Sequence, residues 1–232
     1  MTPAGGTISL LVGAVLLRLT FTDTYRRYVR PEMGPWLAIA GVAVIVLGAV
    51  TLARALRASS DGAALVHGHD HDEHGLGVGW LLLAPIAALL LVAPPTLGSY
   101  GVGRAATVDV RAGKTVFHRL SRRNAPVEMS LLEYDQRAFD HGGASFHSVP
   151  VKLTGFAAGG ARGGFKLARY QIACCAADAI PAVVQVVGTS GALPARDQWV
   201  TVTGTFRHGG GDIPRLAATT GTEIPPPEDP YE

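Results

Sequence analysis

The sequence predicts a two-part protein, with a membrane α-helical N-terminal half of three transmembrane helices and a small all-β C-terminal domain, an OB-like barrel. Only 16% of the 232 residues are charged, against about 25% in soluble domains. The long uncharged runs all lie within residues 1–103. From residue 149 onward, apolar and polar residues alternate between glycine turns, as half-buried strands do. We therefore expect a transmembrane region at 1–103, a linker with a short helix at 104–145 and a β domain at 146–232.

The run at residues 35–53 is the clearest membrane span. No charge interrupts it, and Arg54 and Arg57 close it. A transmembrane helix needs about 20 mostly apolar residues, and aromatic residues such as Trp36 gather at the membrane interface. This run therefore predicts a helix that crosses the bilayer.

Two further spans are predicted at about residues 79–97 and 6–22. The first lies in an uncharged stretch and ends near Pro94 and Pro95, which do not continue a helix. The second is interrupted by Arg18, which can reach the interface from near the helix end. A signal peptide is the alternative for residues 6–22. A basic start is missing and another apolar run follows closely, so we favour a membrane helix.

The distribution of basic residues suggests an orientation for these spans. Loop 23–34 carries Arg26, Arg27 and Arg30, and the C-terminal part also opens with basic residues. Basic loops tend to stay in the cytoplasm, so a multi-pass cell-membrane protein with a cytoplasmic C-terminal domain is expected. The formal net charge is only +2. Basic residues interleaved with aromatic ones are missing, and nucleic acid is therefore not an expected partner.

The loop at 59–78 contains the stretch VHGHDHDEHG. It concentrates half of the eight histidines of the chain among acidic residues. Imidazole and carboxylate groups together suit divalent ions such as Zn²⁺. The candidate ligands are His67, His69, His71, His74, Asp70 and Asp72. The alternative is a solvated linker that happens to be rich in histidine.

The C-terminal domain is expected to contain about five short strands and one helix. Apolar spacing predicts the helix at 129–140. The glycine-rich stretch GGARGG, residues 159–164, predicts a hairpin. The expected strands lie at about residues 149–157, 164–175, 182–188, 197–206 and 214–224. This arrangement fits a small Greek-key barrel such as an OB-fold.

The stretch RYQIACCAADAIP, residues 169–181, holds Cys174 and Cys175, the only two cysteines. With Asp178 they could bind a metal ion; they could also form a strained, labile disulfide or pack as small apolar residues. Neighbouring strand residues point to opposite faces, so both thiols reach one ion only if the strand ends or bulges here. The residues AADAIP supply such a break. Arg169 is expected to pair with a carboxylate or contact a partner, or else to be solvated.

The order of these segments resembles the YcgQ-like family of bacterial membrane proteins, described as permease subunits. The resemblance rests on TDTYRRYVRP, the His/Asp loop, VKLTGF, ARYQIACCAADAIP, WVTVTGTF and the final PPPEDPYE. It implies three membrane helices with a soluble domain, beside a larger multi-span permease and in some members linked to zinc handling. It implies no enzyme activity. The motif positions that carry over are Arg169, Cys174, Cys175, Asp178 and Pro181, and the resemblance assigns no chemical role to them.

The sequence thus predicts a non-enzymatic accessory subunit of a membrane transport complex. Its expected contacts are the lipid bilayer, a larger permease and Zn²⁺ or another divalent metal. The alternative is a membrane-anchored OB-like interaction module with no metal role. A thiol oxidoreductase using Cys174 and Cys175 ranks last, because nothing else in the sequence indicates an enzyme.

Overall fold

The structure, a computed structural model, describes residues 3–61, 96–102, 117–161, 163–188, 192–209 and 211–232. It divides into two compact units, Met1–Pro95 and Thr96–Glu232. The expected span at 79–97 and the histidine loop at 59–78 lie almost entirely outside the described residues.

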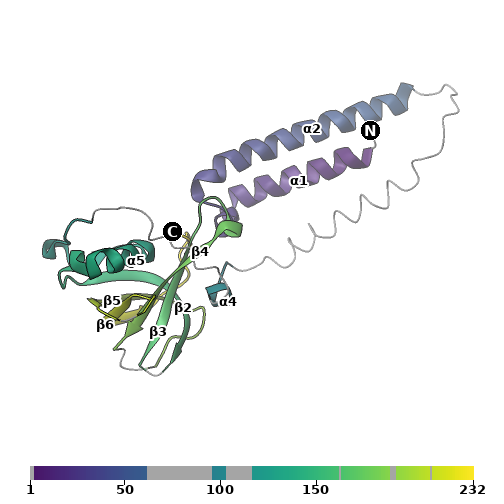
Figure 1. Ribbon diagram of the computed structural model, residues 1–232. Helices are drawn as coiled ribbons and strands as arrows, with labels where there is room; N and C mark the ends of the chain where they lie inside the picture. The colour runs from purple at the N-terminus through teal and green to yellow at the C-terminus, as the bar shows by residue number, and fades with distance from the viewer. Residues whose placement is uncertain (1–2, 62–95, 103–116, 162, 189–191, 210) are drawn as a thin grey trace. The chain divides into compact units, whose positions relative to one another are not determined.

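Two helices form an antiparallel hairpin in the first unit (Figure 1). Helix α1 (Pro3–Phe21) is followed by two short 3-10 turns and by α2 (Gly34–Asp61). The turns are η1 (Thr24–Arg27) and η2 (Pro31–Met33). Tyr25 of η1 is buried, and its hydroxyl donates to the carbonyl oxygen of Pro31 in η2 at 3.1 Å. This contact closes the turn between the two helices.

Glycines allow α1 and α2 to approach closely. A Cβ atom on Gly13 would lie 2.6 Å from a side-chain carbon of Ile45 and 2.8 Å from the carbonyl oxygen of Gly41. A Cβ atom on Gly48 would lie 3.0 Å from the carbonyl oxygen of Gly6. Small residues that bring backbones together in this way are typical of helix pairs in membranes. The hairpin therefore depends on the absence of side chains at these positions.

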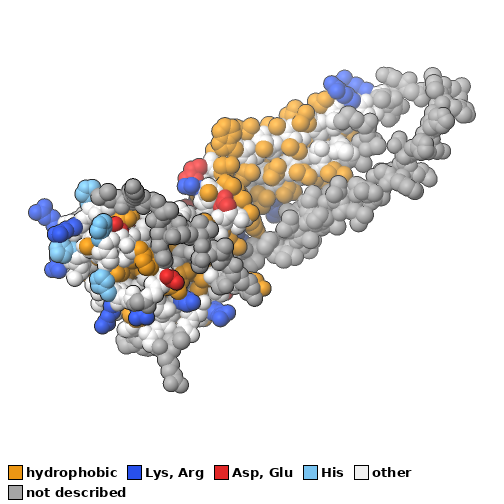
Figure 2. Space-filling view, viewed as in Figure 1, with side chains coloured by type: hydrophobic (Ala, Val, Ile, Leu, Met, Phe, Trp, Pro, Cys, Tyr) orange, Lys and Arg blue, Asp and Glu red, His pale blue; other side chains and the backbone are white. Residues whose placement is uncertain are grey.

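One helix among the described residues is long and apolar enough to cross a membrane, not the three that the sequence predicted. It covers Pro31–Arg57, with a mean hydropathy of 2.4. The apolar part of α1, Gly5–Phe21, is too short to qualify by itself. Only 11% of the qualifying window is buried, unlike the core helix of a soluble protein. Apolar side chains cover this surface (Figure 2), with Trp36, Ile39, Val42, Val46, Leu47 and Val50 exposed.

Five strands form a closed barrel in the second unit. Strand β2 pairs with β3, β3 with β4, β4 with β6, and β6 with β5, which returns to pair with β2. Of these pairs, only β4–β6 is parallel. The strands are β2 (Val151–Ala161), β3 (Gly164–Gln171), β4 (Ile180–Val187), β5 (Trp199–Arg207) and β6 (Arg215–Glu223). The predicted OB-like all-β domain is confirmed.

Residues that the sequence assigned to a linker are part of the barrel's core. Strand β1 (Val127–Glu128) pairs with β2, and α5 (Leu131–Phe139) packs on the barrel (Figure 1). The fully buried residues Leu131 and Tyr134 join the strands' Leu153, Leu167 and Val184 in one cluster. Only one face of α5 is buried, through Leu131, Tyr134 and Ala138. The sequence predicted a short helix here but not that this face would join the core of the barrel.

A smaller apolar cluster ties residues 96–102 to the barrel. It contains Phe156, Ala168, Tyr170 and Trp199, with Leu97 and Val102 packed against them. The hydroxyl of Tyr170 donates to the carbonyl oxygen of Gly98 at 3.0 Å. A short helix, α4 (Ser99–Val102), follows. Residues 96–102, at the end of the region expected at 1–103, are thus folded onto the β domain.

The glycine contacts of the hairpin predict different effects for two alanine substitutions. Gly13→Ala forces a methyl group against Ile45 and the backbone of Gly41, which costs about 1–3 kcal/mol as overpacking does. Gly5→Ala meets nothing within 4 Å and is neutral or stabilises the helix by about 0.5–1 kcal/mol. Thermal unfolding of the detergent-solubilised protein measures both. Equal midpoints for the two variants would show that this packing does not stabilise the hairpin.

Candidate metal centre

The loop between β3 and β4 is organised by the carboxylate of Asp178. Its Oδ1 accepts a hydrogen bond from the backbone N–H of Ala173 at 2.8 Å, and its Oδ2 accepts from Cys174 at 2.8 Å and from Cys175 at 3.4 Å. A 3-10 turn, η6 (Ala176–Asp178), brings the Asp178 carboxylate back to these donors, and β4 begins at Ile180. We call residues 172–179 the cysteine loop. The carboxylate thus satisfies three N–H groups that a continuing strand would have paired.

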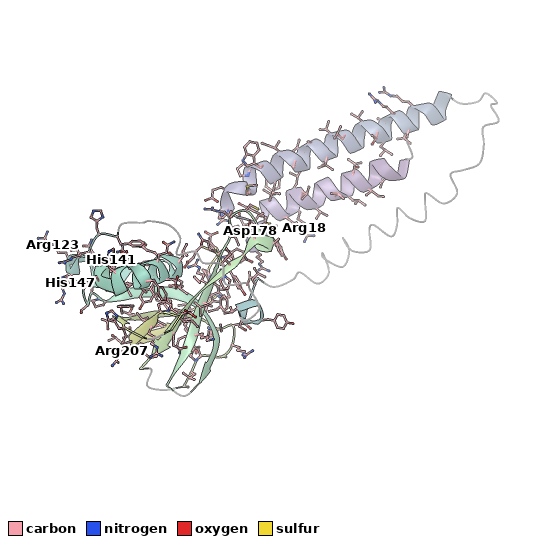
Figure 3. All side chains as sticks on the ribbon, viewed as in Figure 1. Arg18, Arg123, His141, His147, Asp178 and Arg207 are labelled. Atoms are coloured by element: carbon pink, nitrogen blue, oxygen red, sulfur yellow. The ribbon has the colours of Figure 1, made fainter. Side chains whose placement is uncertain are left out.

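The same loop brings three potential metal ligands together. The sulfur atoms of Cys174 and Cys175 and a carboxylate oxygen of Asp178 all lie within 4.8 Å of one another. Figure 3 shows Asp178 in this loop, beyond the ends of the paired strands. Strand β3 ends at Gln171, so the condition for both thiols to reach one ion is met.

The carboxylate and the thiols influence each other's protonation. The Cys174 thiol donates to Asp178, and this hydrogen bond, together with the neighbouring Cys175, raises the pKa of Cys174 from 9.0 to about 11. The hydrogen bonds from the thiol and from the backbone N–H of Cys174 lower the pKa of Asp178 from 3.8 to about 2. The Cys174 thiol is therefore protonated near neutral pH, and the carboxylate is charged.

Two sulfurs and a carboxylate suit a borderline or soft divalent ion such as Zn²⁺. In a tetrahedral site with Zn–S bonds of about 2.3 Å, neighbouring ligand atoms lie roughly 3.8 Å apart. The 4.8 Å limit on the observed separations means that the ligands need to close by at most about 1 Å. Within the described part of the chain three ligands come together, one fewer than a tetrahedral site takes.

Exposure decides against the packing interpretation of Cys174. This side chain is exposed and Cys175 is half-buried, whereas the residues that fill the barrel are almost fully buried. The preceding Ile172 is buried, so the chain leaves the interior before the cysteines begin. Cys174 is therefore displayed on the surface of the loop rather than used as core filler.

Arg169 binds the chain's own C-terminal tail, residues 224–232; the contact with a separate partner stays a prediction. Its guanidinium donates to the carbonyl oxygens of Asp229 at 2.7 Å and of Pro230 and Tyr231 at 3.3 Å each. Its side chain is 18% exposed and lies 4.0 Å from the carboxylate of Glu232. The expected pairing with a carboxylate is thus observed, and the carboxylate belongs to the tail.

Glu232 connects the tail to α5 and is a residue that sequence reasoning missed. Its carboxylate accepts hydrogen bonds from the backbone N–H groups of Leu131 at 2.9 Å and Leu132 at 3.2 Å. Burial raises the pKa of this carboxyl, while these N–H groups and Arg169 act in the opposite direction. The contact spans 101 positions in the sequence, and no local pattern announces it.

The histidines contribute no cluster in the described part of the chain. His67, His69, His71 and His74, with Asp70 and Asp72, lie outside the described residues. His118, His141, His147 and His208 are exposed, and Figure 3 places His141 and His147 at the same end of the β domain as Arg123 and Arg207. Among described residues, the one potential metal cluster is the one at Cys174.

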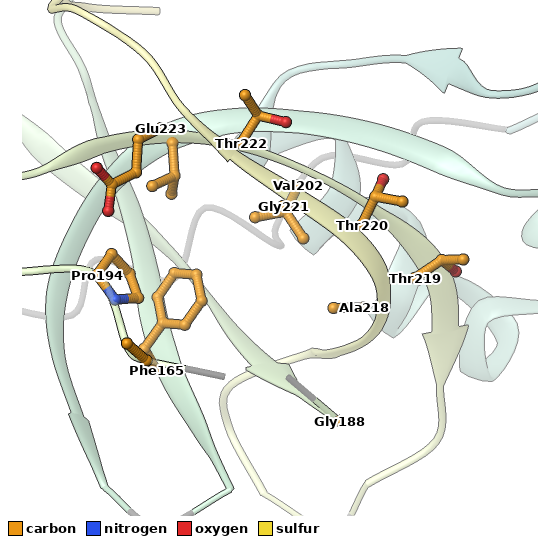
Figure 4. A pocket seen from close by; sticks show the side chains of 12 residues that line it. Phe165, Gly188, Pro194, Val202, Ala218, Thr219, Thr220, Gly221, Thr222 and Glu223 are labelled. Carbon is orange, nitrogen blue, oxygen red and sulfur yellow. The ribbon is translucent and has the colours of Figure 1, made fainter. Parts of the chain in front are cut away.

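A separate small pocket opens at β5 and β6 (Figure 4). Its volume is about 200 Å³, and Phe165, Val200 and Val202 of the core reach its wall. Glu223 lies at its rim, and a Cβ atom on Gly221 would meet nothing within 4 Å. None of its lining residues belongs to the cysteine loop, so the pocket and the candidate metal centre are distinct.

Comparison with known families gives two matches in the order expected for one architecture. Residues 6–106 match the DUF1980 N-terminal domain, and residues 140–232 match the DUF1980 C-terminal domain. The chain carries both DUF1980 domains. The C-terminal DUF1980 domain includes the barrel strands β2 to β6, the cysteine loop and the tail, while β1 and α5 precede it. No curated protein matches the chain.

The contact between Asp178 and Cys174 predicts the reactivity of the thiols. Asp178→Asn removes the charge that holds the thiol proton, so the pKa of Cys174 should fall from about 11 toward 9.0. More thiolate forms at pH 8, and modification by a disulfide reagent should accelerate by roughly 10- to 100-fold. Stopped-flow measurement on the metal-free protein tests this, with Asp197→Asn on the exposed loop before β5 as control. An unchanged rate contradicts the assignment.

Proposed function

We propose that this DUF1980 protein is a non-enzymatic membrane accessory subunit that holds a divalent metal ion, such as Zn²⁺, on its cysteine loop. The observation that carries the proposal is the cluster of Cys174, Cys175 and Asp178, whose ligand atoms lie within 4.8 Å. The three protein ligands within the described part of the chain are one fewer than structural zinc sites use. A site of this kind loads and releases its ion rather than stabilising a fold.

The proposal includes a multi-pass membrane anchor. Pro31–Arg57 is long enough to cross a bilayer, and α1 packs along α2 through Gly6, Gly13, Gly41 and Gly48. In the proposed topology α1 crosses with α2 as a tight hairpin, and residues 79–97 supply a third span. The β domain then lies in the cytoplasm.

The larger permease is proposed as the partner because of the resemblance to YcgQ-like proteins. A membrane role also accounts for the apolar side chains that α2 exposes along its length. Three helices offer too few walls for a transport pathway in a single chain. In this proposal the larger protein supplies the transport pathway. The cysteine loop binds ions that enter or leave that pathway.

A second candidate function is an interaction module without a metal. The three hydrogen bonds from residues 173–175 to Asp178 favour it, because they give the carboxylate a purely structural task as the cap of the loop. In that case the exposed loop would be a recognition surface, and the thiols would be incidental. The two candidates differ in whether the thiols bind an ion.

Zinc titration of the full chain in detergent separates these candidates. We expect about one Zn²⁺ per cysteine loop, detected by competition with a chromophoric chelator, and its loss in the double variant Cys174→Ser, Cys175→Ser. Loading should weaken as pH falls, because protons compete for the thiolates. Zinc binding that is unaffected by the double variant would rule out the cysteine site.

A second variant isolates the histidine loop, whose metal role is also a proposal. Replacing His67, His69, His71 and His74 with alanine should remove any additional bound zinc and leave the cysteine site loaded. A binding stoichiometry that does not change in this variant would remove the metal role of residues 67–74. The double cysteine variant serves as the reciprocal control.

A further inference from the structure

We propose that the C-terminal tail, residues 224–232, positions the cysteine loop, with Arg169 and Glu232 as its positioning residues. The inference rests on the proposed function, because the affinity that the tail sets is that of the metal loop. It adds a device that family matches do not assign: a segment distant in sequence that determines the geometry of the ligands. The evidence is a set of hydrogen bonds at Ile172, the first residue of the cysteine loop, which we call its root.

The tail is attached beside β3 immediately before the cysteine loop. The backbone N–H of Glu232 donates to the carbonyl oxygen of Tyr170 at 2.9 Å, and the N–H of Ile172 donates to the carbonyl oxygen of Glu232 at 3.2 Å. Pairing between β3 and β4 ends with Gln171 opposite Ile180. The hydrogen bond of Ile172 is therefore the last backbone contact that holds the chain before Ala173.

Arg169 holds this segment by the carbonyl oxygens of three consecutive residues, 229–231. A planar guanidinium can serve several acceptors at once, whereas a lysine ammonium acts as a point charge. Its charge also lies over the ring of Trp199 at 5.7 Å from the centroid. This residue is thus a built clamp for the tail's backbone, and only an arginine reproduces its geometry.

Glu232 extends the clamp to α5. Its side chain is 9% exposed and satisfies the N–H groups of Leu131 and Leu132 at the first turn of the helix. Those groups have no partner within a helix, and a carboxylate is favoured at this end. Because one residue binds both Ile172 and the start of α5, the loop root cannot shift without disturbing the helix.

The consequence for the metal follows from the distances in the loop. Binding requires the three ligand atoms to close from separations of up to 4.8 Å to those of one coordination sphere. A fixed root at Ile172 limits this motion to the loop itself, so little ordering remains to be done at binding. Releasing the tail frees the root and adds this ordering to the cost of binding. Contacts that orient metal ligands in this way typically change metal affinity by about 10- to 100-fold.

The test compares Arg169→Lys and Glu232→Gln with the wild-type protein, each as the full chain in detergent. Lysine keeps the positive charge but loses the planar guanidinium that serves several carbonyl oxygens. Glutamine keeps the shape of glutamate, but it has only one side-chain oxygen to accept from the N–H groups of Leu131 and Leu132. We expect both to lower Zn²⁺ affinity by about 10- to 100-fold, measured by chelator competition. Arg207→Lys, at the exposed end of β5, is the matched control and should match wild type.

A readout without metal separates positioning from general stability. Amide hydrogen exchange of the metal-free protein reports how firmly the root of the loop is held. In both variants the N–H groups of residues 172–175 should exchange faster than in wild type, because their hydrogen bonds depend on the fixed root. Unchanged exchange at these residues, or faster exchange throughout the barrel from a loss of stability alone, would overturn the inference.

The outcomes also distinguish this inference from the proposed function. If wild-type protein does not bind Zn²⁺, the proposed function fails, and amide hydrogen exchange at residues 172–175 still decides whether the tail positions the loop. If wild type binds and both variants bind equally well, the inference fails and the proposed function stands. Should Arg169→Lys not fold, Glu232→Gln alone decides, because it loosens the tail at its contact with α5 and leaves Arg169 in place.

Discussion

The hydrogen bonds from Arg169 to the backbone of residues 229–231 are the interaction on which the β domain's architecture depends. Through it the tail meets the residue that follows β3, the start of α5 and, by way of the Tyr231 hydroxyl, the backbone N–H of Leu97. These segments are far apart in the sequence. An arginine with 18% of its side chain exposed donates to three consecutive carbonyl oxygens at once, which an apolar residue could not do.

The barrel was predictable because each strand has a local sequence pattern, the alternation of apolar and polar residues. Alternation at 149–157 and 197–206 became β2 and β5 within a few residues, and the glycine-rich stretch at 159–164 became the β2–β3 turn. The alternation through Cys175 misled at one point. The strand ends at Gln171 because Asp178, three residues past Cys175, takes the N–H groups that pairing would need.

The candidate site was only half predictable for a related reason. Its ligands are neighbours in sequence, so composition alone proposed Cys174, Cys175 and Asp178. The supports of the site are remote: PPPEDPYE has no period that marks a strand, and nothing near Glu232 points to Leu131. The N-terminal hairpin shows the same division, since hydropathy identifies the apolar helices while the contact of Gly13 with Ile45 exists only in three dimensions.

The protonated state of the Cys174 thiol has a consequence for the electrostatics of the domain. In an empty cluster the Asp178 carboxylate is charged and the Cys174 thiol holds its proton. A divalent ion would bind the thiolate and so displace that proton. Loading would therefore change the net charge of the domain by less than the charge of the ion. A neighbouring molecule would then detect a bound ion mainly through the shape of the loop. In solution, binding would be detected as a release of protons.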